Sequence, residues 1–195
     1  MELYHGSNVA VEKPNLALSR KNLDFGIGFY TTVNKNQAED FARKVMIRNR
    51  QEKPLVSVYE FDINAAEPAL DILRFTAPDR LWLDFVHQNR RGLYTGKMYD
   101  CMRRVHTQKG MYPETNTLPK QQLALQGEVV DLVIGPVAND DVFATLLIYE
   151  QGILNVEQTL EALKVKELYS QFVFKTERAL SLLRYANSFT PEAAK

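Results

Sequence analysis

Residues 24–32 read Asp24-Phe25-Gly26-Ile27-Gly28-Phe29-Tyr30-Thr31-Thr32, a β-prone run that two glycines interrupt. Glycine adopts backbone conformations that other residues avoid, whereas Phe, Tyr and Thr favour strands. The stretch therefore predicts a tight loop that enters a strand. An aromatic residue just after such a loop, here Tyr30, can present its ring face to a flat ligand, although simple alternation between core and surface explains it equally well.

The composition is that of an ordinary globular domain. The chain has 195 residues, enough for one domain with a core of its own. Lys and Arg total 24, as do Asp and Glu, so bulk charge does not favour nucleic-acid or membrane binding. The first residues lack the basic and apolar regions of a signal peptide, and no apolar run approaches the ~18 residues that span a bilayer. With a single cysteine, Cys101, and no internal disulfide, we expect a soluble, cytoplasmic protein.

Helices and strands are mixed irregularly along the chain. Strands are expected at 3–6, 29–32, 55–61, 129–134 and 171–174. Helices are expected where capping residues precede apolar positions at helical spacing: Asn34 with Gln37 before Ala38, Phe41, Ala42, Val45 and Met46; Pro78 at a first helical position before Trp82 and Phe85, which we expect in the core; Asn139; Asn155 with Gln158; and Thr176 before a helix at 177–183. The absence of strict alternation favours an α+β fold over a doubly wound parallel sheet.

Residues 90–120 differ from the rest because they carry seven basic and two acidic side chains and show little periodicity. This excess is either an ordinary solvated surface or a recognition surface for an acidic or phosphate-bearing partner. In the second case Tyr94, Tyr99 and Tyr112 would add stacking surfaces.

Several common sites are not indicated. Gly26-Ile27-Gly28 is half of a dinucleotide fingerprint, but no third glycine and no helix follow it, so a Rossmann site is rejected. The histidines His5, His87 and His106 lie far apart and lack ligand spacing, so we expect no metal.

A second short segment, Leu3-Tyr4-His5-Gly6-Ser7, places an imidazole, a bare backbone and a hydroxyl within a few residues. Glycine lets a flat polar group approach the backbone closely. A histidine beside a turn is also a common structural residue, which is the alternative interpretation of this segment.

Taken in order, the two segments resemble the ADP-ribosyltransferase superfamily, in the branch with a His–Tyr–Glu or variable triad found in diphtheria-type toxins and poly-ADP-ribose polymerases. Nearly the whole chain is similar to a bacterial family of uncharacterised domains placed in that superfamily. Three further blocks carry this similarity: residues 82–90, 131–140 and 170–180. The resemblance implies one domain at 1–188 built on split antiparallel sheets flanked by helices, with an insertion at 92–126 and a flexible tail at 189–195.

The resemblance also implies roles for individual residues. His5 would hydrogen-bond a ribose hydroxyl of NAD, and the backbone of Gly6 would bind the nicotinamide carboxamide, with Ser7 nearby. Tyr30 would stack on the nicotinamide ring, and Gln171 stands where the third triad residue is expected. Arg20, in the segment between the two motifs, either pairs with the pyrophosphate or is ordinary surface charge.

Gln171 is the main departure from the pattern. When nicotinamide leaves, positive charge grows on the ribose, and a glutamate would stabilise that charge better than an amide. We therefore expect slow, single-unit transfer, or another acid such as Asp24 or Glu177 in this role.

The sequence thus predicts a mono-ADP-ribosyltransferase that uses NAD as substrate, needs no metal and modifies a protein or nucleic-acid acceptor. A non-catalytic NAD- or partner-binding module and an RNA-directed transferase of the same superfamily are the alternatives. The role as a toxin, regulator or defence factor stays open.

Overall fold

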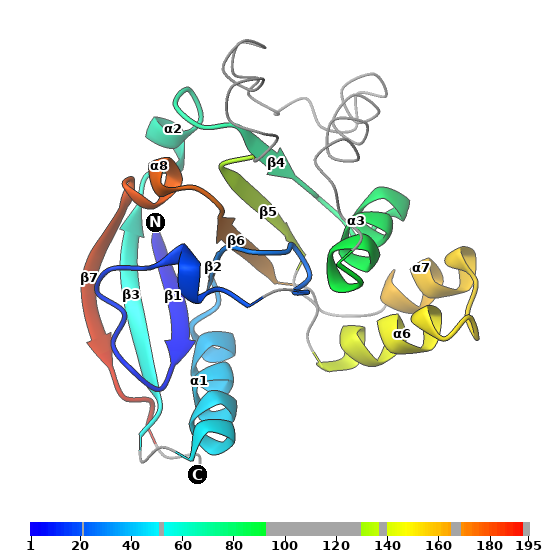
Figure 1. Cartoon of the computed structure of the whole chain (residues 1–195), viewed down its shortest axis with the longest axis horizontal. Coiled ribbons are helices and arrows are strands. Elements are labelled where there is room, and N and C mark those ends of the chain that lie inside the picture. The colour runs from blue at the N-terminus through cyan, green and yellow to red at the C-terminus, as the bar shows by residue number, and fades with distance from the viewer. Residues whose placement is uncertain (21, 51–52, 93–129, 137–139, 165–168, 193–195) are drawn as a thin grey trace.

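The computed structural model describes residues 1–20, 22–50, 53–92, 130–136, 140–164 and 169–192. Within these ranges the fold is α+β, as predicted (Figure 1). The elements in chain order are β1 (Glu2–Ser7), the 3-10 helix η1 (Leu16–Leu18), β2 (Phe29–Thr32), α1 (Lys35–Asn49), β3 (Leu55–Phe61), α2 (Ile63–Ala66), β4 (Ile72–Arg74), α3 (Arg80–Arg90), β5 (Leu132–Pro136), α6 (Asp140–Glu150), α7 (Val156–Lys164), β6 (Ser170–Phe174), α8 (Glu177–Leu180) and β7 (Leu183–Phe189).

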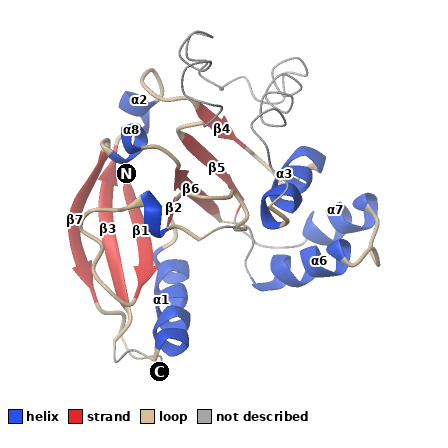
Figure 2. Ribbon diagram, in the orientation of Figure 1, coloured by secondary structure: helices blue, strands red, loops and turns tan. Residues whose placement is uncertain are grey.

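The strands form one seven-stranded sheet in the order β4-β5-β6-β2-β1-β3-β7. The sheet is mixed rather than wholly antiparallel, because β4 and β5 pair in parallel. A single registered pair, Tyr4 with Thr32, joins β1 to β2, whereas six pairs join β1 to β3. The sheet therefore consists of two parts, β7-β3-β1 and β2-β6-β5-β4, that meet at a narrow junction (Figure 2).

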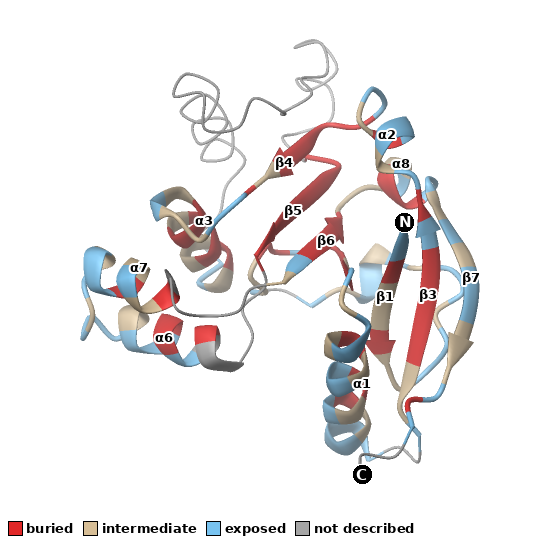
Figure 3. Ribbon diagram, turned by 180° about the vertical axis from the view of Figure 1, so that it is seen from behind, coloured by how far each residue is buried: buried red, intermediate tan, exposed pale blue. Residues whose placement is uncertain are grey.

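Both faces of the sheet are covered, and the central strands are buried (Figure 3). On one face α1 packs on β1 and β3 through Ala38, Ala42 and Val56, while α3 and α6 cover the other part of the sheet. The opposite face carries an aromatic cluster that includes Phe29, Phe61, Phe172 and Phe174. The chain between β1 and β2 adds Val11 and Leu16 to that cluster. The junction thus lies between hydrophobic clusters on both faces of the sheet.

Local capping predictions are mostly confirmed. The Asn34 side chain accepts from the amide of Gln37 at 3.0 Å, and Asn155 and Gln158 cap each other reciprocally. Pro78 was wrongly placed inside a helix: α3 begins at Arg80, and the carboxylate of Asp79 caps it by accepting from the Trp82 amide at 2.8 Å. Trp82 itself is fully buried, as expected.

Two predictions about apolar segments need correction. Phe41 was expected on the buried face of its helix, but the small residues Ala38 and Ala42 make the close contacts, and Phe41 is 51% exposed. The buried strand expected at 129–134 is present as β5, but its bounds are shifted to Leu132–Pro136.

The C-terminal segment also differs from the prediction. The helix expected at 177–183 ends at Leu180, and β7 follows as an edge strand that pairs with β3 from Phe61 with Leu183 to Val56 with Phe189. The tail expected at 189–195 therefore begins inside a strand. The expected insertion at 92–126 lies almost entirely outside the described residues, as does Asn139.

Gly6 has no room for a side chain, because a Cβ there would lie 2.1 Å from the carbonyl oxygen of Ala38 and 2.8 Å from the amide nitrogen of Ala42. We predict that Gly6→Ala pushes α1 away from β1 and lowers the free energy of unfolding by about 1–3 kcal/mol, as expected for overpacking. Urea denaturation followed by circular dichroism measures this change. An unchanged denaturation midpoint would show that α1 does not pack on β1 as described.

Candidate functional site

The backbone N–H and C=O groups of β1 point alternately toward β3 and toward β2, and those that point toward β2 lie at the junction. The Met1 amino group donates to the Phe61 carbonyl at 2.8 Å, and the Phe61 amide donates to the Met1 carbonyl at 2.9 Å. Hydrogen-bonding directions alternate along a strand, so the backbone N–H and C=O groups of odd-numbered residues of β1 point toward β3, and those of even-numbered residues point toward β2. The backbone groups of Tyr4 and Gly6 therefore point toward β2.

The imidazole of His5 ends the ladder between the two strands. If the pairing of Tyr4 with Thr32 continued, Gly6 would pair with Tyr30. Instead, Nδ1 of His5 lies 2.7 Å from the carbonyl oxygen of Tyr30 and takes the acceptor that the Gly6 amide would use. The N–H and C=O of Gly6 are left outside the β1–β2 ladder. A donor and an acceptor side by side on one strand match a primary carboxamide, which carries both groups.

The hydrogen bond to Tyr30 also determines which nitrogen of His5 carries the proton. A carbonyl oxygen only accepts, so Nδ1 donates, and Nε2 keeps its lone pair in the neutral ring. Burial lowers the pKa of His5, and the hydrogen bond to the Tyr30 backbone opposes this shift only in part. The ring also packs against Phe29, with centroids 4.5 Å apart. His5 is thus a neutral imidazole whose Nε2 can accept a hydrogen bond from a hydroxyl group.

The side chain of Tyr30 lies on the face of β2 opposite to that of Phe29 and the ring of His5, because neighbouring residues of a strand point in opposite directions. Its hydroxyl donates to the carbonyl of Gly26 at 2.6 Å and accepts from the amide of Phe25 at 3.0 Å. Burial and, next, the charge of Asp24 raise its pKa well above the usual value, so the phenol stays protonated. Tyr30 therefore offers an anchored ring rather than an acid or base, and His5 contacts its backbone rather than its ring.

Gln171 belongs to the same face of the sheet as Tyr30. It pairs with Thr32, two residues from Tyr30 along β2, and its side chain is 5% exposed. Among the described residues its Nε2 has no hydrogen-bond partner. Leaving such a buried donor unpaired costs about 1–3 kcal/mol, which a ligand with an acceptor oxygen would recover.

Neither acid that the sequence suggested lies beside Gln171. Asp24 is ion-paired with Arg90 of α3 at 3.3 Å, next to the glycine loop. Glu177 is exposed at the start of α8, beyond the end of β6 that is opposite to Gln171. The described residues therefore leave a neutral amide at this position.

The remaining predicted residues are Ser7 and Arg20. Ser7 follows Gly6 at the end of β1 and pairs with Leu55 of β3. Arg20 is exposed and lies near enough to Arg48 of α1 that its charge, after the larger effect of burial, lowers the pKa of Arg48.

Sequence reasoning missed two features of α1. It did not mark Arg48, whose charge interacts with that of Arg20, and it placed Phe41 on the buried face of the helix. The pair Ala38 and Ala42 was the signal that could have indicated the exposure of Phe41. Two small residues let the helix pack closely on the sheet along a narrow stripe, and a large ring beside them then stays outside the contact.

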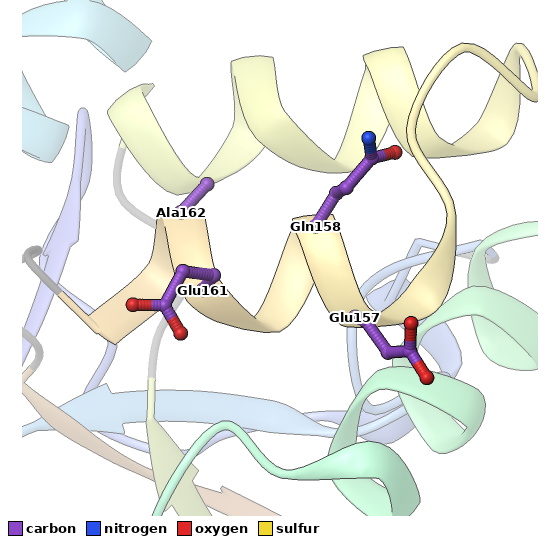
Figure 4. A pocket seen from close by; sticks show the side chains of 4 residues that line it. All are labelled: Glu157, Gln158, Glu161 and Ala162. Atoms are coloured by element: carbon purple, nitrogen blue, oxygen red, sulfur yellow. The ribbon is translucent and has the colours of Figure 1, made fainter.

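A surface hollow elsewhere on the molecule contains none of these residues. It is lined by Glu157, Gln158, Glu161 and Ala162, all from α7 (Figure 4). The residues for which the structure gives positions contain no group of three or more His, Cys, Asp or Glu that could hold a metal ion. In the same part of the chain, no helix is long and apolar enough to cross a membrane.

A family model described as "Protein of unknown function (DUF3990)" matches residues 1–185, nearly the whole chain. No curated protein and no solved structure matches the chain.

The lowered pKa of His5 gives a pH prediction. As the pH falls below about 6.5, the unfolded chain binds a proton at His5 before the folded chain does, so the folded state loses stability. We expect the wild type to lose more stability between pH 7.5 and pH 5.5 than His5→Asn, which lacks this titration. Urea denaturation of both proteins at the two pH values measures the difference, and equal losses would refute a depressed pKa at His5.

Proposed function

The chain belongs to the DUF3990 family of unknown function, and we propose that it is an ADP-ribosyltransferase that binds NAD at the junction of β1 and β2. The observation that carries this proposal is the backbone of Gly6, which His5 keeps out of the sheet ladder beside the anchored ring of Tyr30. NAD would lose nicotinamide and donate ADP-ribose to a protein or nucleic-acid acceptor.

The nicotinamide end of NAD fits the groups at Gly6. Its carboxamide would accept from the Gly6 N–H and donate to the Gly6 C=O, a pairing that discriminates against ligands without an amide. The ring of Tyr30, held through its hydroxyl, would stack on the pyridine ring.

The rest of NAD requires hydroxyl and phosphate recognition. The unprotonated Nε2 of His5 can accept from a ribose hydroxyl, which a protonated histidine could not do. Arg20 and Arg48 place two guanidinium groups near each other, an arrangement that a pyrophosphate would stabilise by relieving their repulsion.

In the reaction, the bond between C1′ of the ribose and the nicotinamide nitrogen breaks, and its electron pair leaves with nicotinamide. The positive charge that remains on the sugar is then attacked by an acceptor atom, which loses its proton. Gln171 can accept from a ribose hydroxyl through its amide oxygen, but it brings no full negative charge. We therefore expect slow transfer of single ADP-ribose units.

Replacing Gln171 by Glu tests the chemistry. We predict that Gln171→Glu increases nicotinamide release from NAD by on the order of tenfold or more, because a carboxylate stabilises the positive sugar. The assay is best run at pH 8, where a carboxyl with a pKa raised by burial still ionises. Chromatography of released nicotinamide measures the rate, with Gln171→Leu as the matched control of similar size. If neither the wild type nor the Glu variant releases nicotinamide, the enzymatic proposal fails.

Replacing Tyr30 tests the binding site. We predict that Tyr30→Ala abolishes NAD binding, since the stacking surface is gone. Tyr30→Phe keeps the ring but loses the hydroxyl that anchors it to the glycine loop, so it weakens binding on the order of tenfold without abolishing it. Titration calorimetry measures the affinities, and circular dichroism verifies that both variants fold. Equal affinity for NAD in the wild type and a folded Tyr30→Ala would place the ligand elsewhere.

A non-catalytic NAD-binding module is the second candidate, and the neutral side chain of Gln171 favours it. This candidate would be selected by tight NAD binding in calorimetry together with neither release of nicotinamide nor transfer of label from NAD to any component of a lysate.

A further inference from the structure

Lys175, the residue after β6, has no part in the function proposed above. Its Nζ donates to the carbonyl of Phe25 at 2.5 Å and to the carbonyl of Ile27 at 2.8 Å. Both acceptors belong to the glycine loop at 25–28, which lies about 150 positions earlier in the chain. The side chain thus ties the end of β6 to the loop that enters β2.

Lys175 and Tyr30 bind alternate carbonyl groups of this loop. Lys175 binds those of Phe25 and Ile27, while the hydroxyl of Tyr30 binds that of Gly26. The next carbonyl, of Gly28, accepts from Ser19 Oγ at 2.9 Å. Four successive carbonyl groups therefore point to donors, and two of them depend on one ammonium group.

The conformation of the loop also depends on glycine at position 26. Gly26 has a φ of 73°, in the region that favours glycine, and a Cβ there would lie 2.5 Å from Oδ1 of Asn89. Without the ammonium, the carbonyls of Phe25 and Ile27 would turn toward water. The Phe25–Gly26 segment that holds the Tyr30 hydroxyl would then lose its geometry.

Stability alone does not explain a lysine at this place. None of the ion pairs found among the described residues includes Lys175, so carbonyl dipoles surround its charge. Burial lowers the pKa of Lys175 to about 8, which shows that the site disfavours the charge. A methionine of similar length would fill the same space without that penalty.

We propose that Lys175 is a positioning residue, whose ammonium holds the loop at 25–28 in the conformation that orients the ring of Tyr30 toward its planar ligand. The loop-holding part stands on the free protein, and the effect on the ligand rests on the proposed NAD site.

Hydrogen exchange on the free protein tests the first part. In Lys175→Met we expect the amides of Phe25, Gly26 and Gly28 to exchange at least tenfold faster, while amides of the β1–β3 ladder keep their rates. Lys175→Arg, which retains donors, should restore slow exchange, and Lys13→Met, at an exposed lysine, should match the wild type. Lys175→Gln, with one donor group, serves in place of the Met variant if that variant does not fold.

Two results would overturn the loop-holding role. One is unchanged exchange at the three loop amides in Lys175→Met. The other is equal acceleration in the loop and the β1–β3 ladder, because that shows a general loss of stability.

Calorimetry with NAD tests the second part. We expect Lys175→Met to bind NAD at least tenfold more weakly than Lys13→Met, with recovery in Lys175→Arg. Faster loop exchange with unchanged NAD affinity would overturn the ligand-orienting role. If the wild type binds no NAD, the proposed function fails, while the exchange experiment still decides whether Lys175 holds the loop.

Discussion

The hydrogen bond from Nδ1 of His5 to the carbonyl of Tyr30 separates β1 from β2, and the site depends on that separation. Backbone groups that leave a sheet ladder take other partners, either side chains or water. At the Tyr30 carbonyl that partner is the imidazole of His5. Because its other nitrogen stays unprotonated, the same side chain that opens the sheet also offers an acceptor beside the opening.

The second requirement is that the glycine loop keeps its shape. Tyr30 and Lys175 hold it by side-chain bonds from β2 and from the end of β6. The end of β6 is itself fixed: the amide of Lys175 donates to the carbonyl of Asp131, and the buried carboxylate of Asp131 accepts from Thr176 and pairs with Arg178. A short series of polar contacts therefore connects the buried Asp131, through Lys175, to the glycine loop. Such contacts favour one loop conformation more sharply than apolar packing would.

The site also contains a polar group that the described fold does not satisfy. Natural structures pair nearly all buried donors, so the amide of Gln171 is an exception that needs a reason. It lies across from Thr32, two residues from Tyr30 along β2, and a ligand with an acceptor atom is the simplest reason. The same neutral amide limits how much charge the site can stabilise, which connects the geometry to the slow chemistry proposed for this protein.

The sequence by itself determined the features that depend on a few neighbouring residues. The caps at Asn34, Asn155 and Thr176, the loop before Phe29 and the strand around Gln171 could be predicted because each rests on bonds within about four residues or on a local apolar run. The tertiary structure decided where those elements meet. It turned the segment after Leu180 into an edge strand on β3, left Phe41 exposed, and joined His5 to the carbonyl of Tyr30 and Lys175 to the glycine loop. These outcomes depend on partners 25 to 150 positions away, and local propensities do not encode them.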